Sequence, residues 1–291
     1  MDIKKIFKQE QPFFLAIPAI VWQVMFLFLP ISVIVGLSVI NPQGHSLSTL
    51  FTLENFKAFF AMPFVWVLVR SLLLAFVTAS LCLILAFPVA YFVAQKVQRG
   101  KNILLFFLIL PFWTSLLVHA YSWFFILEKQ GLINTILTKI GLINSPITLL
   151  NNSGVIYLVM IYCYLPFMIL PLYSILEKID KRLLEASADL GANTWNTFVN
   201  VTLPLAMPGI RTGFFLVFVP SFGEFVIPSL LGGGKQMYVG SLISHYFLVA
   251  QDPYSGAAFT TLSGLVLIVI SCLIYFYFKK KSGIIVDQEG V

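Results

Sequence analysis

The run SLLLAFVTASLCLILAFPVAYFVA, residues 71–94, contains no charged side chain and exceeds the ~18 apolar residues that indicate a membrane-spanning helix. Similar runs recur along the whole chain. Of its 291 residues, 59% are hydrophobic and 10% are charged, whereas a soluble domain is roughly 25% charged. So few charges cannot cover the surface of a soluble protein. The sequence therefore predicts an all-α integral membrane protein.

Six apolar segments are long enough to cross the hydrocarbon layer, which requires about 20 residues. They comprise residues 13–40, 64–95, 102–127, 153–177, 208–230 and 255–278. The first is too long for a signal peptide and no Ala-x-Ala site follows it, so we interpret it as an uncleaved span. We predict three parts: a tail, first span and outer loop (1–63), a main transmembrane domain (64–278) and a C-terminal tail (279–291).

Basic residues distinguish the two sides of the membrane. With six spans, both terminal tails and the connections after the second and fourth spans share one side. Those four segments hold 13 of the 18 Lys and Arg residues. Because cytoplasmic segments carry an excess of Lys and Arg, we predict that both termini are cytoplasmic. The net charge of +6 then reflects orientation, and no nucleic-acid partner is expected.

The sequence argues against metal, cofactor and catalytic sites in this chain. Cys82, Cys163 and Cys272 lie inside apolar runs without paired spacing, so we predict neither a disulfide nor a metal site. Gly232-Gly233-Gly234-Lys235 lacks the spacing of a phosphate-binding loop. The spans hold one clear carboxylate and no cluster of nucleophiles. A membrane-embedded enzyme is therefore disfavoured.

The connection after the fourth span has a helical pattern. Apolar residues from Leu183 to Leu190 recur at helical spacing, and Gly191 suits the turn that follows a helix. A second short helical piece, Thr194 to Val201, is expected to end at Leu203-Pro204 before the fifth span. The pattern fits a helix resting on lipid as well as one docked on protein. Small side chains at 186–188 favour protein, because they let a partner approach the backbone.

The same stretch resembles the EAA motif of type I ABC importer permeases, written E-A-A, three residues, G, nine residues, I-x-L-P. Here the matching positions are Glu185, Ala186, Ser187, Gly191, Val201, Leu203 and Pro204, with Ser and Val as the two departures. The looser resemblance covers residues 64–278, the permease domain. It implies a coupling helix that docks on a cytoplasmic ATPase, with Glu185 in polar contact and Gly191 forming the turn.

The family resemblance also implies the partners. Type I importers combine two permease subunits with two ATP-binding subunits and an external binding protein, and ATP and Mg²⁺ bind the ATPase. We expect a heterodimer of homologous permeases, with a homodimer left open. A passive channel is disfavoured because a passive pore needs no ATPase dock. Apart from these proteins, the expected surroundings are the lipids of a bacterial inner membrane.

Glu224 is the one acidic residue clearly inside a predicted span. A carboxylate at that depth costs ~2.5–3.5 kcal/mol, so it usually faces a partner or a cavity. Two interpretations stand: Glu224 reaches the outer interface or is protonated, or it is a counter-ion for a cationic substrate. In the second, Phe222 and Phe225 add cation–π contacts. Pro220, Gly223 and Pro228 are expected to interrupt the helix there.

Residues 222–235, FGEFVIPSLLGGGK, resemble the G-D/E-[YF]-V-x-P-x-L-L-G-G-G-K run of spermidine/putrescine permeases. The resemblance implies a polyamine substrate delivered by an external polyamine-binding protein. An importer of another small solute is the alternative. Tyr121, Trp123, Tyr162 and Tyr164 remain open between channel lining and ordinary packing.

Overall fold

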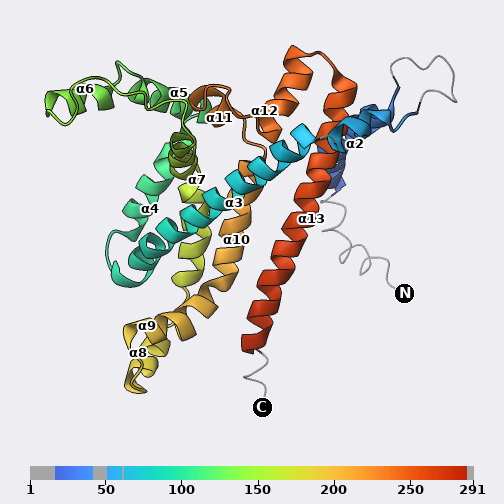
Figure 1. Cartoon of the computed structure of the whole chain (residues 1–291). Helices are drawn as coiled ribbons and strands as arrows, with labels where there is room; N and C mark the ends of the chain where they lie inside the picture. The colour runs from blue at the N-terminus through green and yellow to red at the C-terminus, as the bar shows by residue number, and fades with distance from the viewer. Residues whose placement is uncertain (1–16, 42–50, 61, 287–291) are drawn as a thin grey trace, which may run out of the picture. The chain divides into compact units, whose positions relative to one another are not determined.

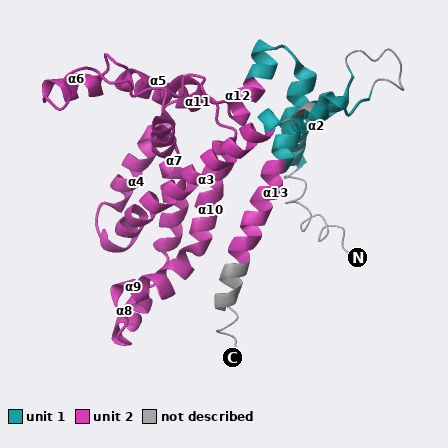
Figure 2. Cartoon of the chain, viewed as in Figure 1, with its two compact units in different colours: residues 1–64, 245–265 teal, residues 65–244, 266–291 magenta. Residues whose placement is uncertain are grey.

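A computed structural model describes residues 17–41, 51–60 and 62–286 of the chain. Regular structure in these ranges is helical, apart from one isolated antiparallel bridge between Ile40 and Phe51. The chain forms two compact units (Figure 2): unit 1 is residues 1–64 and 245–265, and unit 2 is residues 65–244 and 266–291. The division into 1–63, 64–278 and 279–291 stays a prediction.

Unit 1 contains η1 (Val24–Phe28), α2 (Leu29–Val39), η2 (Glu54–Phe60), η6 (His245–Val249) and the start of α13 (Pro253–Val286). The amide of Asn55 donates to the carbonyl oxygens of Ser38 and Ile40, at 3.0 Å each. The ring of Phe259 lies 5.7 Å from that of Phe59 and 6.4 Å from that of Tyr246. These contacts join segments that are far apart in sequence.

Unit 2 contains the remaining elements, seen in Figure 1. They are most of α3 (Met62–Tyr91), then η3 (Phe92–Lys96), α4 (Lys101–Ile109), η4 (Leu110–Trp113), α5 (Leu116–Leu127), α6 (Leu132–Lys139), α7 (Ser153–Leu176), α8 (Lys181–Asp189), α9 (Thr194–Thr197), η5 (Phe198–Thr202), α10 (Leu203–Phe222), α11 (Val226–Leu231), α12 (Val239–Ser244) and the part of α13 that follows residue 265.

Glycine allows α10 to approach α7 closely. A Cβ on Gly213 would lie 2.7 Å from the Met168 sulfur, and one on Gly209 would lie 2.9 Å from the Pro171 carbonyl oxygen. Without a strong hydrophobic driving force between helices in lipid, such close approach supplies the packing energy. The pair α7–α10 is therefore the centre of unit 2.

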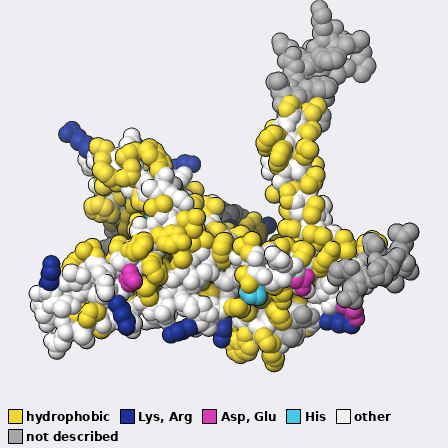
Figure 3. Space-filling view, turned by 90° about the horizontal axis from the view of Figure 1, so that it is seen from above, with side chains coloured by type: hydrophobic (Ala, Val, Ile, Leu, Met, Phe, Trp, Pro, Cys, Tyr) yellow, Lys and Arg dark blue, Asp and Glu magenta, His cyan; other side chains and the backbone are white. Residues whose placement is uncertain are grey.

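Five helices among the described residues are long and apolar enough to cross a membrane. They are Ile17–Val39, Met62–Lys96, Ser153–Leu176, Thr194–Phe222 and Pro253–Lys279. Hydrophobic side chains cover much of the visible surface, whereas charged ones are few (Figure 3). Four predicted spans coincide with these helices to within a few residues. The count of six spans and the cytoplasmic position of both termini stay predictions.

The third predicted segment, 102–127, is divided rather than continuous. It forms α4, the 3₁₀ turn η4 with Pro111, an extended Thr114-Ser115 pair, and α5. Proline lacks an amide donor and interrupts the α-helical hydrogen bonds. The Thr114 hydroxyl donates to the Pro111 carbonyl at 2.8 Å, and the Ser115 hydroxyl accepts from the Leu117 amide at 3.3 Å. Side chains thus satisfy part of the broken backbone.

The fifth predicted segment, 208–230, is displaced. The prediction that a helical piece ends at Leu203-Pro204 is wrong, because the helix runs from Thr194 to Phe222 without interruption. The wider π-helical turn η5, which ends two residues before Pro204, accommodates the proline ring and its missing amide. The expected interruption near Gly223 is confirmed: α10 ends at Phe222 and α11 begins at Val226, although Pro220 and Pro228 lie inside helices.

The two ends of unit 2 differ in content. In Figure 1, α8 and α9 lie at its lower end, and α5, α6, α11 and α12 lie at its upper end. The upper end is held by close contacts to the Gly233 backbone: a Cβ on Gly233, whose φ is +61°, would lie 1.9 Å from the Asn151 side-chain oxygen. The Asn151 amide donates to the Leu231 carbonyl at 2.8 Å. The glycine run therefore packs the loop after α11 against the start of α7.

Candidate functional site

The stretch that resembles the EAA motif begins with α8, as predicted. Asp180 caps its N-terminus, because the Asp180 carboxylate accepts from the Arg182 amide at 3.0 Å. Glu185 and Ala186 are exposed on this helix. Both side chains are therefore available to a partner.

Gly191 ends the helix in a Schellman motif. Its φ is +81°, a left-handed conformation that favours glycine. The Gly191 amide donates to the Ala188 carbonyl at 2.9 Å, and the Ala192 amide donates to the Ser187 carbonyl at 3.1 Å. The predicted role of Gly191 in the turn is thus seen in the backbone geometry.

The turn at Gly191 joins α8 to α9, and the two helices form a hairpin. Asn193 caps α9 by accepting from the Asn196 amide at 2.8 Å. The hydroxyls of Ser187 and Thr197 hydrogen-bond at 2.9 Å and join α8 to α9. The serine that departs from the motif therefore makes a specific contact here. Leu203 and Pro204 are half-buried at the start of α10.

The hairpin exposes large apolar groups beside a cavity. Leu190 is 89% exposed and Trp195 is 69% exposed, more than the other exposed apolar side chains of this region, Leu183 and Val199. A cavity of about 530 Å³ lies between this hairpin and the end of α3, where Tyr91 lines it together with Leu184 and Phe198. Exposed aromatic and apolar anchors are typical of a protein interface. We call residues 181–204 the docking hairpin.

The second predicted site centres on Glu224, in the break between α10 and α11. Glu224 is only 6% exposed. One carboxylate oxygen accepts from the Tyr164 hydroxyl at 2.8 Å, and the other accepts from the Val226 amide at 2.9 Å, at the start of α11. Phe222 is buried and Phe225 is 43% exposed, so the two rings lie in different environments. The carboxylate has a structural role in the break whatever else it does.

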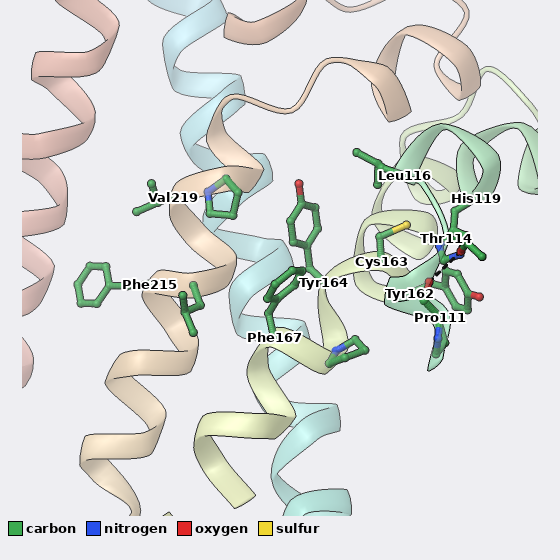
Figure 4. Close-up of a pocket in the computed structure, with 13 residues that line it drawn as sticks. Pro111, Thr114, Leu116, His119, Tyr162, Cys163, Tyr164, Phe167, Phe215 and Val219 are labelled. Atoms are coloured by element: carbon green, nitrogen blue, oxygen red, sulfur yellow. Dashed lines mark hydrogen bonds between the residues drawn. The ribbon is translucent and has the colours of Figure 1, made fainter. Parts of the chain in front are cut away.

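A largely apolar cavity of about 550 Å³ lies next to this pair, because Tyr164 lines it. In Figure 4, Tyr164 and Phe167 of α7 lie between α10, which carries Phe215 and Val219, and the divided segment α4–η4–α5. The lining residues are Pro111, Thr114, Leu116, His119, Tyr162, Cys163, Tyr164, Pro166, Phe167, Phe215, Leu216, Val219 and Pro220. Several aromatic rings thus line one space, and the buried carboxylate of Glu224 is joined to it through Tyr164.

Sequence reasoning missed the partner of Glu224. Tyr164 lies 60 positions earlier in the chain, and its helix has no local signal that points to this contact. The sequence also contains no sign of the bond between the hydroxyls of Ser187 and Thr197, because Ser187 stands in the motif only as a departure from alanine. No group of three or more potential metal ligands occurs among the residues that the structure describes.

The chain matches known proteins over most of its length. Residues 83–283 match the family described as "binding-protein-dependent transport system inner membrane component". The spermidine/putrescine transport system permease protein PotB of Escherichia coli (strain K12) is 38% identical over 253 residues, covering 85% of this chain and 92% of that protein. Its namesake in Haemophilus influenzae is 35% identical over 262 residues, covering 89% and 90%.

Two further comparisons concern the function class and the fold. The inner membrane ABC transporter permease protein YdcU of Escherichia coli (strain K12) is 37% identical, covering 80% of this chain and 76% of that protein. A crystal structure of a bacterial ABC transporter that imports the acidic polysaccharide alginate superposes with a TM-score of 0.70 over 96% of this chain and 98% of that one. Its identity is 18%, so it supports the fold alone. The chain therefore belongs to the binding-protein-dependent transport system inner membrane components, and it is a permease subunit of an ABC importer rather than an enzyme.

Proposed function

We propose that this permease carries polyamines of the spermidine/putrescine type across the inner membrane. The names of relatives that match 85–89% of the chain support this substrate class. The observation that carries the choice of a cation is Glu224, a buried carboxylate joined to the 550 Å³ cavity through Tyr164. A polyamine alternates ammonium groups with methylene chains. A space with aromatic walls and one carboxylate nearby suits both parts.

The proposed route passes the break between α10 and α11. Tyr162, Phe167 and Tyr164 present ring faces or edges along the cavity, and each ammonium that passes them gains cation–π attraction. Glu224 supplies the compensating charge in surroundings where a lone ammonium is costly. Phe222 and Phe225 flank that carboxylate along the chain, and the exposed ring of Phe225 offers a further contact.

The proposed partners follow from the docking hairpin. The complex combines a second, homologous permease chain, two ATP-binding subunits and an external polyamine-binding protein. The hairpin faces the cytoplasm, as the excess of Lys and Arg on its side requires. It seats α8 on an ATPase subunit, which binds ATP and Mg²⁺. Its exposed Leu190 and Trp195 give that interface its apolar anchors.

Uptake of labelled polyamines into vesicles that hold the whole complex tests the substrate. Glu224→Gln keeps the shape and removes the charge, and we expect a loss of about tenfold in ATP-dependent uptake, the effect of one charged hydrogen bond. The matched control is Glu54→Gln, the same change at an exposed carboxylate paired with Lys57 at 2.7 Å. Equal uptake by both variants would refute the counter-ion role. Uptake of no polyamine by the wild-type complex would refute the substrate.

Replacement of Glu185 by alanine tests the dock separately. This exposed carboxylate caps no helix, so its removal leaves the fold of α8 intact. We expect ATP hydrolysis stimulated by loaded binding protein to fall about tenfold, because one charged contact is lost. Glu54→Ala, the same change at an exposed carboxylate outside the docking hairpin, is the control. Undiminished stimulation in Glu185→Ala would rule out the polar contact.

A further inference from the structure

The end of α7 that leads into the docking hairpin is tied to the loop after α3. Gln95 of η3 is buried, and its side-chain amide donates to the Leu176 carbonyl at 2.6 Å and to the Ile179 carbonyl at 3.5 Å. Leu176 is the last residue of α7. The final carbonyl groups of a helix have no partner within the helix. Gln95 therefore caps the C-terminal end of α7 from another part of the chain. This end of α7 lies five residues before Lys181, where α8 begins.

A second tie lies beside the first. The Lys101 ammonium lies 3.3 Å from a Glu177 carboxylate oxygen and donates to the Ala94 carbonyl at 3.0 Å. The Tyr173 hydroxyl and then Lys101 hold the pKa of Glu177 below its usual range. Lys101 is the first residue of α4. This ion pair thus joins the start of α4 to the end of α7.

The end of α3 also contacts the docking hairpin directly. The rings of Phe87 and Phe198 meet edge to face at 5.3 Å, and Tyr91 lines the 530 Å³ cavity with Trp195. Three segments, α3 with η3, the start of α4, and the end of α7, therefore converge next to α8. Each of these contacts links residues separated by 76 or more positions, except the local bonds from Lys101 to Ala94 and from Tyr173 to Glu177.

We propose that Gln95, Lys101 and Glu177 form a latch that transmits motion of the docking hairpin to α7 and α4. This inference rests on the proposed docking of the hairpin on an ATPase. The latch holds the α7 end nearest α8, while further along the same helix Tyr162, Tyr164 and Phe167 line the 550 Å³ cavity. The cavity's other wall, around Pro111 and Thr114, follows α4. Both walls are thereby connected to the hairpin through three side chains.

The chemistry of the latch suits transmission better than simple anchoring. An amide that bonds two successive turns of backbone fixes the direction of the α7 end, and the ion pair fixes the spacing between α7 and α4. Neither residue of the ion pair is fully buried: the Lys101 side chain is 26% exposed and that of Glu177 is 43% exposed. Exposed pairs contribute little to stability. Their loss is therefore expected to affect coupling more than folding.

The test measures polyamine uptake and ATP hydrolysis in the same vesicles and compares their ratio. Gln95→Leu removes the donor, and Gln95→Lys keeps a donor that a helix C-terminus favours. We expect the ratio to fall about fivefold in Gln95→Leu, the effect of one hydrogen bond, and to recover in Gln95→Lys. Arg99→Ala, an exposed residue in the same loop, is the control and should leave the ratio unchanged.

An exchange of the two charges tests the ion pair between Lys101 and Glu177. This test remains informative even if Gln95→Leu fails to fold. Lys101→Glu and Glu177→Lys should each lower the uptake-to-hydrolysis ratio, and the double variant should restore it. An unchanged ratio in assembled single variants, or no recovery in the double variant, would overturn the latch. A wild-type complex that hydrolyses ATP but takes up no polyamine would instead refute the proposed substrate. In that case, the effect of each variant on ATP hydrolysis stimulated by the binding protein would still test the latch.

Discussion

Replacement of Gly191 by proline is expected to abolish ATP-driven uptake, with a loss of about a hundredfold or more, as proline costs ~3 kcal/mol where the backbone cannot accept it. Two properties of the position cause this. Its φ of +81° lies far from the φ near −65° that proline requires. Its amide donates to the Ala188 carbonyl at 2.9 Å, and proline has no amide hydrogen to donate.

The expected structural result is a misdirected hairpin. Without the Schellman motif α8 no longer folds back on α9, so the contact between Ser187 and Thr197 and the proposed ATPase surface are lost together. Gly191→Asn is the matched control, because asparagine tolerates a left-handed conformation. Uptake and co-purification of the ATPase subunits are the two measurements. Normal uptake by Gly191→Pro would show that the turn is not needed for coupling.

Replacement of Gly240 by alanine is expected to destabilise the folded permease strongly. A Cβ at this position would lie 2.2 Å from the Gly223 carbonyl oxygen and 3.1 Å from the Glu224 carbonyl carbon. Both atoms are backbone, and Glu224 is fixed by Tyr164 and the Val226 amide. The break cannot move aside cheaply. We expect destabilisation of about 3 kcal/mol, the upper end for overpacking.

Thermal unfolding and size-exclusion chromatography of the purified complex would measure this effect. Gly264→Ala is the matched control: Gly264 lies inside α13, and a Cβ there meets no atom within 4 Å. It should leave stability unchanged or raise it by ~0.5–1 kcal/mol, since alanine favours a helix over glycine. If Gly240→Ala has the same melting temperature as the wild type, then α12 does not pack tightly against the break between α10 and α11.

Hydropathy predicted the spans that are made of uninterrupted helix, since length and apolar content alone define them. It missed the division at Pro111, because the extended residues Thr114 and Ser115 barely change the mean hydropathy of the segment. It also started the fifth helix too late at Pro208. Prolines normally favour a helix boundary, but here the helix continues through Pro204, because the preceding π-helical turn Phe198–Thr202 accommodates it. A widened turn has no strong sequence signal.

The candidate site shows the same limit. Gly191 could be placed from the sequence because its role depends on local backbone conformation. The bond between Tyr164 and Glu224 could not, because it depends on how α7 packs against α10. From the sequence, the glycine run after α11 lacks the spacing of a phosphate-binding loop and indicates a resemblance to polyamine permeases, but it gives no packing role. The structure adds a packing reason for Gly233, whose neighbour is the Asn151 side chain.

The division of the segment 101–127 has a consequence for how the chain is made. At 1.5 Å per residue, α4 and α5, with 9 and 12 residues, are about 14 and 18 Å long, so neither reaches across a hydrocarbon layer of about 30 Å. During synthesis this stretch leaves the ribosome before α7, which packs against α5. The hydroxyls of Thr114 and Ser115 bond the backbone at the break from within the segment. Because these bonds satisfy backbone groups from within the segment, we expect them to lower the cost of placing an interrupted helix in lipid before α7 is synthesised.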